Sequence, residues 1–343
     1  MSDLKKRICR GGSMAFGVAA MWAAASCQDP GPDSHAASSA IATTTSVAIA
    51  LRTPSGVGAT SVALAATESL VINAGTTVTG GGKGPEDAAA AATNLGTSVT
   101  RVEPDAVIKG DLWSASSVDL RDRVHVLGIL HAHTLARGNS VVIDGGIDGS
   151  PKLTPENTLP WTVTVPPSGP AISLPPGQAG ARVPGSYGAV QVFSNATLTL
   201  VAGIYFFDTL QLEPQSHVAL DQTAGPVVIY VRDSVQLRGE LRATNARPPD
   251  LALIYLGTSE VRAEVPFSGT IAAPNARLFL GSTTPGHAGA FFAKSIEVGP
   301  HTTVTYRAPH ALLAGGLPIP SCIDAIVPDP TLTGHARDVQ YQA

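Results

Sequence analysis

The chain has 343 residues, of which 44% are apolar and 14% are charged, and its formal net charge is −4. Globular domains usually contain about 25% charged residues, so ion pairs are sparse here, while 35 glycines and 27 prolines indicate many turns. The apolar content is sufficient for an extended core in one or two domains. Because the sequence has no basic stripe with interleaved aromatic residues, nucleic acid is not expected as a partner.

The N-terminal residues have the pattern of a secretion signal. An apolar stretch at 14–25 follows four basic residues, Lys5, Lys6, Arg7 and Arg10. The stretch is too short to span a bilayer, whereas a positive region followed by a short apolar region is typical of a signal peptide. Residues 1–26 are therefore predicted to be a signal peptide.

The segment Ala24-Ala-Ser-Cys27 resembles a bacterial lipobox, in which the cysteine is lipidated. This resemblance predicts a lipid on Cys27, which would anchor a lipoprotein to the membrane of the cell envelope, as in the outer membrane. The alternative is cleavage by ordinary signal peptidase after an Ala-x-Ala-like site, which gives a secreted protein. Cys27 is then available to pair with Cys322 in an oxidising compartment.

Residues 27–66 are predicted to be a flexible tether, because they are rich in Ala, Ser and Thr as far as about residue 50 and show no sustained periodicity. A first solenoid section is predicted at 67–150. Within it, residues 85–94 are predicted as one short helix.

Three seven-residue blocks repeat in this first section, at 106–112, 124–130 and 141–147. Each block is apolar at its first, third and seventh positions, which is the alternation of a strand with one buried face. Their glycines lie 18 and 17 residues apart, at Gly110, Gly128 and Gly145. We expect each block to be one strand of a stacked coil.

A proline-rich stretch at 151–186 interrupts the repeats and is predicted to be an insertion or crossing loop. A second solenoid section is predicted at 187–310. In it, Tyr-Phe-Phe-Asp-Thr-Leu-Gln-Leu aligns with Tyr-Val-Arg-Asp-Ser-Val-Gln-Leu 25 residues later, so Tyr205 is matched with Tyr230 and Leu212 with Leu237. Residues 311–343 are predicted to be a peripheral tail.

These repeats predict an all-β fold, a right-handed parallel β-helix in two sections. A short apolar strand that recurs at a nearly fixed interval cannot bury both of its faces alone, whereas stacked coils bury them together. The alternative is an antiparallel sandwich with short strands and regular turns.

Several segments resemble a group of secreted, often lipoprotein-like proteins from myxobacteria and their relatives. The similarity covers most of residues 67–310, and it implies a β-helical fold without supplying an established activity or catalytic residues. The segments that carry it include Arg101-Val-Glu-Pro-Asp-Ala106, Pro184-Gly-Ser-Tyr-Gly188, Phe267-Ser-Gly-Thr-Ile-Ala-Ala-Pro-Asn275 and His287-Ala-Gly-Ala-Phe-Phe-Ala-Lys294.

A metal site is the first candidate for chemistry. His131 and His133 form a His-x-His pair at the strand parity of His125, and Asp144 lies one coil along as a third ligand. The competing interpretation places these histidines on an outer face, solvated or hydrogen-bonded, and it is favoured because no ligand set is complete. No cofactor and no catalytic residue are predicted.

The function expected from the sequence is that of a surface-anchored structural or adhesive protein without catalysis, which contacts polysaccharide or another copy of itself. The alternative is a carbohydrate-active enzyme of the β-helix lyase or hydrolase type, for which Asp208 and Asp233 stand at equivalent repeat positions. Ice binding is disfavoured, because the threonines of Thr302-Thr-Val-Thr305 have no partners at the repeat interval.

We expect Cys27→Ala to abolish palmitate labelling and to release the protein from membranes, because Cys27 ends a short apolar run in a lipobox-like segment. Labelling of the wild type and the variant in the native host, followed by membrane fractionation, checks this. Cys322→Ala is the matched control and should label normally. Equal labelling of Cys27→Ala, or none in the wild type, would contradict the lipid anchor.

Overall fold

The computed structural model describes residues 44–53, 62–80, 90–150, 157–245 and 250–308. The predicted signal peptide, Cys27 and the predicted tail at 311–343 lie outside these residues. Every regular element in the described part of the chain is a β-strand. No helix there is long and apolar enough to cross a membrane.

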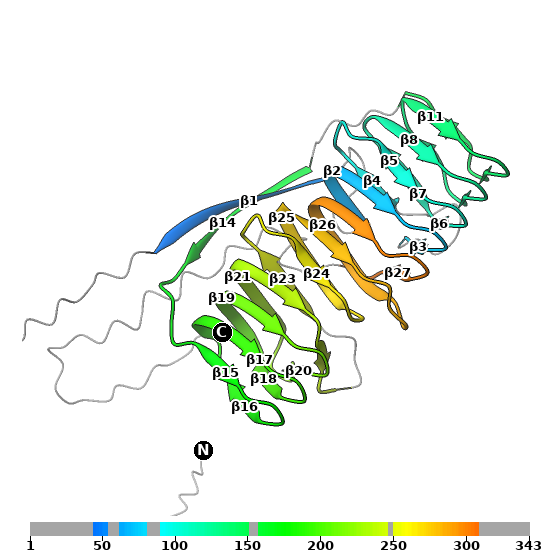
Figure 1. The fold of residues 1–343 in the computed structure, drawn as a ribbon. Helices are drawn as coiled ribbons and strands as arrows, with labels where there is room; N and C mark the ends of the chain where they lie inside the picture. Colours follow the sequence, from blue (N-terminus) through cyan, green and yellow to red (C-terminus); the bar gives the residue numbers. More distant parts are fainter. Residues whose placement is uncertain (1–43, 54–61, 81–89, 151–156, 246–249, 309–343) are drawn as a thin grey trace, which may run out of the picture. The chain divides into compact units, whose positions relative to one another are not determined.

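The strands fall into two runs along the chain, the second of which begins with β14 (Figure 1). The first run is β1 (Thr45–Thr53), β2 (Leu64–Ile72), β3 (Thr77–Thr79), β4 (Ala90–Asn94), β5 (Thr100–Val102), β6 (Val107–Lys109), β7 (Asp111–Ser114), β8 (Ser117–Leu120), β9 (His125–Val126), β10 (Leu130–His131), β11 (Thr134–Arg137), β12 (Val142–Ile143) and β13 (Ile147–Asp148). The second is β14 (Asn157–Val165), β15 (Ile172–Leu174), β16 (Ala179–Arg182), β17 (Gly185–Val192), β18 (Thr197–Val201), β19 (Gly203–Leu212), β20 (His217–Asp221), β21 (Val227–Leu237), β22 (Glu240–Ala243), β23 (Leu251–Tyr255), β24 (Val261–Ala263), β25 (Ser268–Leu280), β26 (His287–Val298) and β27 (Thr303–Tyr306).

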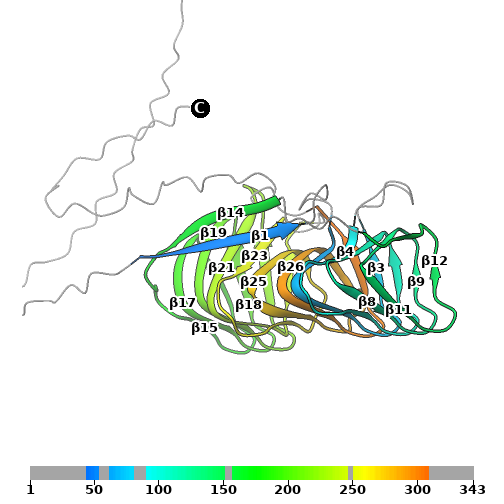
Figure 2. The same cartoon turned by 90° about the horizontal axis from the view of Figure 1, so that it is seen from above.

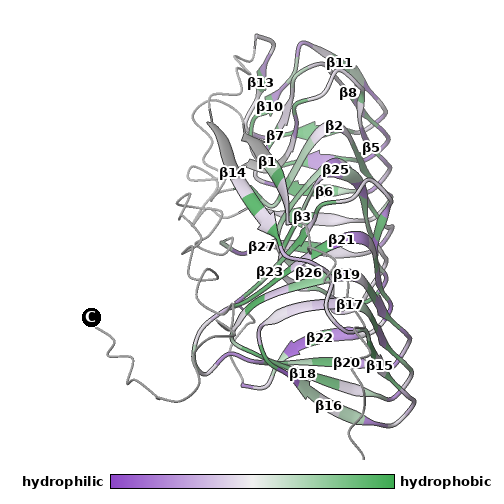
Figure 3. Ribbon diagram, turned by 90° about the vertical axis from the view of Figure 1, so that its left-hand side faces the viewer, coloured by the Kyte–Doolittle hydropathy of each residue, from purple (hydrophilic) through white to green (hydrophobic). Residues whose placement is uncertain are grey.

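The strands β2 to β13 and β15 to β27 stack in parallel as a β-solenoid of about ten turns. Strands of successive coils pair in register, as in Ile108 beside Val126 and Val126 beside Ile143. Buried and half-buried residues alternate along strands such as β18 and β20, and Figure 3 shows apolar (green) and polar (purple) residues interspersed along the strands of the stack. The predicted parallel β-helix is therefore confirmed.

The coils do not stack in chain order. From β2 the chain adds coils in one direction as far as β13, and then resumes at the far end of the stack with β15 and builds back towards β2 (Figures 1 and 2). There β26 pairs in parallel with β2, from Leu64 beside Phe291 to Ile72 beside Val298. The two predicted sections thus share one continuous sheet.

A left-handed backbone conformation recurs at one turn of most coils. It orients the chain so that the residue after it begins the next strand facing inward, as shown by buried Thr76, Ala106 and Ser216. Few residues other than Gly and Asn adopt this conformation readily. The residues that adopt it, with φ between 53° and 73°, are Gly75, Asp105, Arg123, Ser140, Gly177, Asn195, Gln215 and His301.

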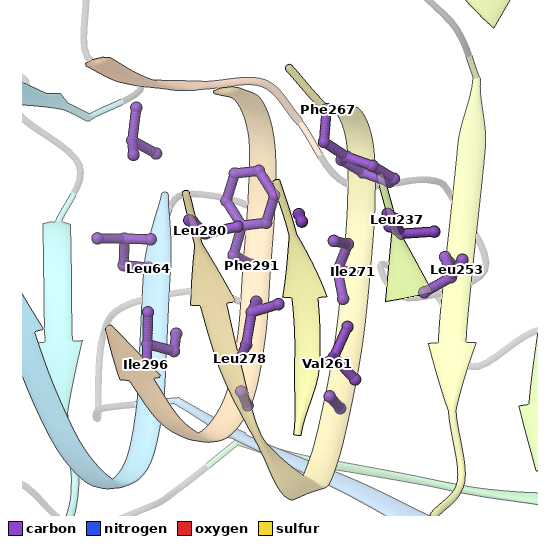
Figure 4. Close-up of a cluster of buried hydrophobic side chains, with 14 of the residues drawn as sticks. Leu64, Leu237, Leu253, Val261, Phe267, Ile271, Leu278, Leu280, Phe291 and Ile296 are labelled. Carbon is purple, nitrogen blue, oxygen red and sulfur yellow. The ribbon is translucent and has the colours of Figure 1, made fainter. Parts of the chain in front are cut away.

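The main core lies inside the coils, where inward side chains of successive strands stack into apolar columns (Figure 4). Leu64, Phe291 and Ile271 are fully buried neighbours in one such column, which crosses the junction between the two runs of strands. Burial of apolar surface stabilises the fold by about 25 cal/mol per Å², so the fully buried residues at this junction stabilise the union of the two runs.

A second apolar layer lies on the outer face of the sheet. Phe206 stacks on Tyr230 with ring centroids 5.1 Å apart and an interplanar angle of 12°, and Ile254 continues the column. Val163 and Val165 of β14 are buried in the same cluster. β14 pairs with β1 in an antiparallel ribbon. Val163, Val165 and Val47 of this ribbon pack against the outer apolar layer, so the ribbon covers it.

Three of the segment assignments made from the sequence are wrong. The predicted tether at 27–66 contains β1 and the start of β2, and the predicted helix at 85–94 contains strand β4. The predicted insertion at 151–186 contains β14, β15 and β16 and the first residues of β17. Its prolines suggested a loop, but Pro166, Pro170 and Pro175 lie between strands, where no backbone N–H is needed for the sheet.

The register of the 25-residue repeat is partly confirmed. Leu212 pairs with Leu237 as predicted, but Tyr205 pairs with Ile229, so its predicted match with Tyr230 is wrong. A register shift between Phe207 and Thr209 places one extra residue in β21. Tyr205 therefore points into the main core, whereas Tyr230 belongs to the outer layer.

Gly128→Ala should destabilise the protein by about 1–3 kcal/mol, because overpacking forces the backbone to move. A Cβ at Gly128 would lie 2.4 Å from the carbonyl carbon of Gly110 in the neighbouring coil. Denaturant unfolding measures the change. Gly149→Ala is the control, since its Cβ would meet nothing within 4 Å and the change should stay within about 0.5 kcal/mol. Equal costs for the two variants would contradict the close coil contact.

Candidate functional site

Polar side chains stand in register at the corner where β17, β19 and β21 turn into β18, β20 and β22. Before the turn, Gln191, Gln211 and Gln236 lie side by side on successive strands. After it, the corresponding row is Thr197, His217 and Glu240. We call these two rows and the turns between them the polar corner.

The polar corner contains a hollow of about 380 Å³, within the size range of small-molecule sites. The turns at Asn195 and Gln215 both have positive φ, so their side chains project from the coil. The residues that line the hollow are Asn195, Gln215, His217, Arg238, Gly239, Glu240 and Val265.

Much of the hydrogen-bonding capacity of the polar corner is unused within the described residues. His217 Nδ1 lies 3.5 Å from Glu240 Oε2, yet it is a buried atom without a hydrogen-bond partner there. Gln211 and Gln236 likewise make no side-chain hydrogen bond to another described residue. Glu213, in contrast, accepts hydrogen bonds from the backbone N and Oγ of Ser194 and fixes the turn.

The same outer face carries paired charges beyond the glutamine row. Gln236 is followed in register by Arg262, whose Nη1 lies 2.6 Å from Glu260 Oε1 and whose Nε lies 3.3 Å from Glu264 Oε1. The Glu260 hydrogen bond raises the pKa of the Arg262 guanidinium. Exposed pairs of this kind contribute at most about 1 kcal/mol. The glutamine row therefore ends at Gln236, because the next position in register is the ion-paired Arg262.

The predicted metal ligands do not form one site. His125 Nε2 lies 2.8 Å from Asp144 Oδ2, and His131 Nδ1 lies 3.0 Å from Asp148 Oδ2. His133 is exposed between β10 and β11. Among the described residues, no group of three or more His, Cys, Asp or Glu side chains is arranged to hold a metal ion. The coil register creates His–Asp pairs, because β9 pairs with β12 and β10 with β13.

His131 belongs to a cluster that the sequence analysis did not find. Its ring stacks on Trp113, with centroids 3.6 Å apart and an interplanar angle of 14°, and His131 is only 8% exposed. Burial lowers the pKa of its imidazole, but the carboxylates of Asp111 and Asp148 outweigh burial and raise the pKa above its ordinary value. The 18-residue offset between Trp113 and His131, the same as that of Gly110 and Gly128, was the available signal.

The two acids considered for catalysis share one cation. Arg232 Nη2 lies 2.9 Å from Asp208 Oδ1, and Arg232 Nε lies 3.2 Å from Asp233 Oδ1. Asp208 of β19 and Asp233 of β21 lie within the register shift between these two strands. A glycosidase needs two carboxyl groups on either side of the scissile bond, whereas here both carboxylates are bound to one guanidinium.

No family model matches the chain, and no curated protein matches it. Among solved structures, an ice-binding protein from an Antarctic bacterium of the Flavobacteriaceae is 12% identical, with a TM-score of 0.23. The match covers 71% of this chain and 79% of that one. A likeness this low carries no inference about function. The fold and the corner define a parallel β-solenoid that presents rows of polar side chains.

His131→Gln should cost more stability at about pH 5 than at about pH 8. The folded-state pKa of His131 is raised, so its contribution is complete below the ordinary pKa of 6.5 and is lost as pH rises through the folded-state value. Thermal unfolding of wild type and variant at the two pH values measures the difference. A cost that is independent of pH would contradict the charged His131–Asp148 pair.

The pKa of His287 is shifted in the opposite direction to that of His131. It is 1% exposed, its Nε2 lies 2.9 Å from the Gly281 carbonyl oxygen, and burial lowers the pKa of its imidazole. Below the ordinary pKa of 6.5 the unfolded chain takes up a proton that the folded protein resists, so His287 destabilises the fold in acid. His287→Gln should therefore reduce acid sensitivity, even where it lowers stability at neutral pH.

Proposed function

We propose that the protein is a non-catalytic adhesive or structural protein of the cell envelope that binds polysaccharide through the polar corner. The observation that carries this proposal is the row of Gln191, Gln211 and Gln236, in register on adjacent strands and beside a polar hollow. The row offers the same chemical group three times in succession.

A polymer of hydroxyl-bearing units suits such a row. Each amide has both donor and acceptor atoms, and a sugar hydroxyl also donates and accepts. The amides recur at the strand spacing of about 4.8 Å, so an extended chain laid across the strands meets one amide per coil. A single hydrogen bond contributes only about 0.5–1.5 kcal/mol. Repetition along a polymer adds such small contributions into useful avidity.

His217 and Arg238 add nitrogen atoms that can form hydrogen bonds to this surface, and Glu240 adds an acceptor. Arg238 Nε is 3.5 Å from Glu264 Oε2 at the rim, so the guanidinium keeps donors free for a ligand. The imidazole of His217 is half-buried, and its Nδ1 faces Glu240 Oε2 at 3.5 Å. A sugar hydroxyl in the hollow can bond to the exposed part of this pair, because a hydroxyl both donates and accepts.

The competing function is carbohydrate-active catalysis. Glycoside hydrolysis usually requires two carboxyl groups that flank the scissile bond. Glu240 is the one carboxylate among the described residues that line the hollow, and Asp208 and Asp233 are both bound to Arg232. These pairings favour binding over hydrolysis.

The proposal includes a lipid on Cys27 as the envelope anchor, with secretion after ordinary cleavage as the alternative. The first described strand begins at Thr45, so residues 28–44 separate this anchor from the fold. The polar corner is built from residues 191–240, which belong to the second run of strands.

Co-sedimentation with cell-envelope polysaccharide from the native host tests the proposal. The double substitution Gln211→Ala and Gln236→Ala should weaken binding by at least about tenfold, which corresponds to about 1.4 kcal/mol. The control is Asn139→Ala, which removes an exposed side-chain amide in the first run of strands, and this variant should bind as well as the wild type.

Three outcomes separate the alternatives. Loss of binding in the double variant alone supports the polar corner. Equal binding by wild type and double variant would place the ligand elsewhere, and absence of binding by wild type would overturn the adhesive function. Release of new reducing ends or unsaturated sugars by the wild type would favour the enzyme.

A further inference from the structure

We infer that the polymer bound at the polar corner is an uncharged polysaccharide, and that polysaccharides bearing carboxylate, sulfate or phosphate groups are excluded from it. This inference rests on the proposed function and narrows its ligand. It depends on two features of the surface beside the hollow. One is a patch of uncharged side chains, and the other is the pairing of the three guanidiniums around that patch.

The patch consists of two parallel rows of outward side chains on β17, β19 and β21. Leu210 and Leu212 of β19 belong to the main core, so the alternate residues Thr209 and Gln211 point outward. The strand register carries both outward positions to the neighbouring strands. The two rows are Ala189, Thr209 and Ser234, and Gln191, Gln211 and Gln236. We call these six residues the neutral patch.

The neutral patch offers hydrogen-bonding groups without fixed charge. Its strands lie about 4.8 Å apart, and residues two apart along one strand lie about 6.7 Å apart. The hydroxyls of Thr209 and Ser234 and the amides of the glutamine row both donate and accept hydrogen bonds, as sugar hydroxyls do. No side chain of the neutral patch carries a charge. The patch therefore suits hydroxyl groups and supplies no counter-charge to an anion.

Arg232 borders the neutral patch on the side of Thr209 and Ser234. Its Nη2 lies 2.9 Å from Asp208 Oδ1, and its Nε lies 3.2 Å from Asp233 Oδ1. Arginine recognises a carboxylate or a phosphate through these same N–H donors. An anionic group on a polymer would therefore have to compete with two carboxylates that are already in place.

Arg238 and Arg262 border the neutral patch on the side of Gln236, and both share Glu264. Arg238 Nε lies 3.5 Å from Glu264 Oε2, and Arg262 Nε lies 3.3 Å from Glu264 Oε1. Arg262 is also paired with Glu260. Both guanidiniums keep N–H groups that can bind a hydroxyl, but their charges are balanced. They therefore add hydrogen bonds to a neutral ligand without attracting an anionic one.

Carboxylates outnumber guanidiniums around the neutral patch. The six carboxylates are those of Asp208, Asp233, Glu213, Glu240, Glu260 and Glu264. Against the three guanidiniums they leave three negative charges, with histidine counted as neutral. At an ionic strength of about 0.15 M, charges act over about 8 Å, which exceeds the spacing of the rows. An anionic polymer on the neutral patch is therefore repelled.

Ion-exchange fractions of envelope polysaccharide from the native host test the inference. One fraction is retained by an anion exchanger, one by a cation exchanger and one by neither. In co-sedimentation with the full chain at about 0.15 M ionic strength, the unretained fraction should bind best. Its half-saturating concentration should be at least about tenfold below that of either charged fraction, which corresponds to about 1.4 kcal/mol.

Glu264→Gln tests the role of the charge pairing. The substitution keeps the size of the side chain and removes the carboxylate that Arg238 and Arg262 share. Binding of the anionic fraction should rise by at least about threefold, a gain typical of one exposed ion pair. The matched control is Glu103→Gln, whose carboxylate lies 3.9 Å from Arg101 Nε in the first run of strands, and it should bind as the wild type does.

The outcomes separate this inference from the proposed function. Stronger binding of a charged fraction, weakened by the double substitution of Gln211 and Gln236, would overturn the neutral ligand and keep the polar corner. An unchanged affinity of Glu264→Gln for the anionic fraction would also overturn the inference. If no fraction binds, or if the double variant binds as wild type, the proposed function fails and the inference fails with it. Circular dichroism checks that each variant is folded, and Glu260→Gln replaces Glu264→Gln if the latter does not fold.

Discussion

Parallel pairing between β2 and β26 is the interaction on which the rest of the structure depends. The backbone N–H of Phe291 donates to the Ala63 carbonyl oxygen at 2.8 Å. The pairing then continues to Val298, past a register shift between Ala66 and Ser69. A coil contacts only its neighbours in a solenoid, so this joint makes two separately built stacks one core. Without it, Leu64, Leu70 and Phe291 would lie at two additional exposed ends. The joint links residues far apart in sequence, which makes its closure entropically costly and slow.

Stacking also explains how a chain with few charges obtains distinct surfaces. Each outward position repeats in the next coil, so side chains of one kind collect into rows. The row through Phe206 and Tyr230 is apolar and is covered by the β1–β14 ribbon. The row through Gln191, Gln211 and Gln236 is polar and lies beside the hollow of the polar corner. The glutamine row carries the proposed adhesive function, whereas the apolar row packs against the β1–β14 ribbon.

Local repeats were sufficient to predict the class of fold and part of its register. A Cβ at Gly128 would meet Gly110, and a Cβ at Gly145 would meet Gly128, each in the preceding coil. The spacing of these three glycines therefore equals the length of one coil. The Tyr205 match failed because one extra residue in β21 shifts the register without disturbing the flanking similarity. The order of the coils could not be predicted from the sequence. A repeat relates segments that follow one another along the chain, whereas β2 and β26 are neighbours in space that lie far apart in the sequence. Gln211 and Gln236 stand at the same position of the aligned repeats, but Gln191 joins the row only through the strand register.

Native-state hydrogen exchange in increasing denaturant tests the central joint most directly. The amides of β2 and β26 should lose protection together, at one denaturant concentration, because each strand forms the edge of the other's stack. Phe291→Ala should lower that concentration for both strands alike. If β26 instead loses protection at a denaturant concentration at which β2 stays protected together with β4 and β5, the two stacks are independent units and the joint does not unite them.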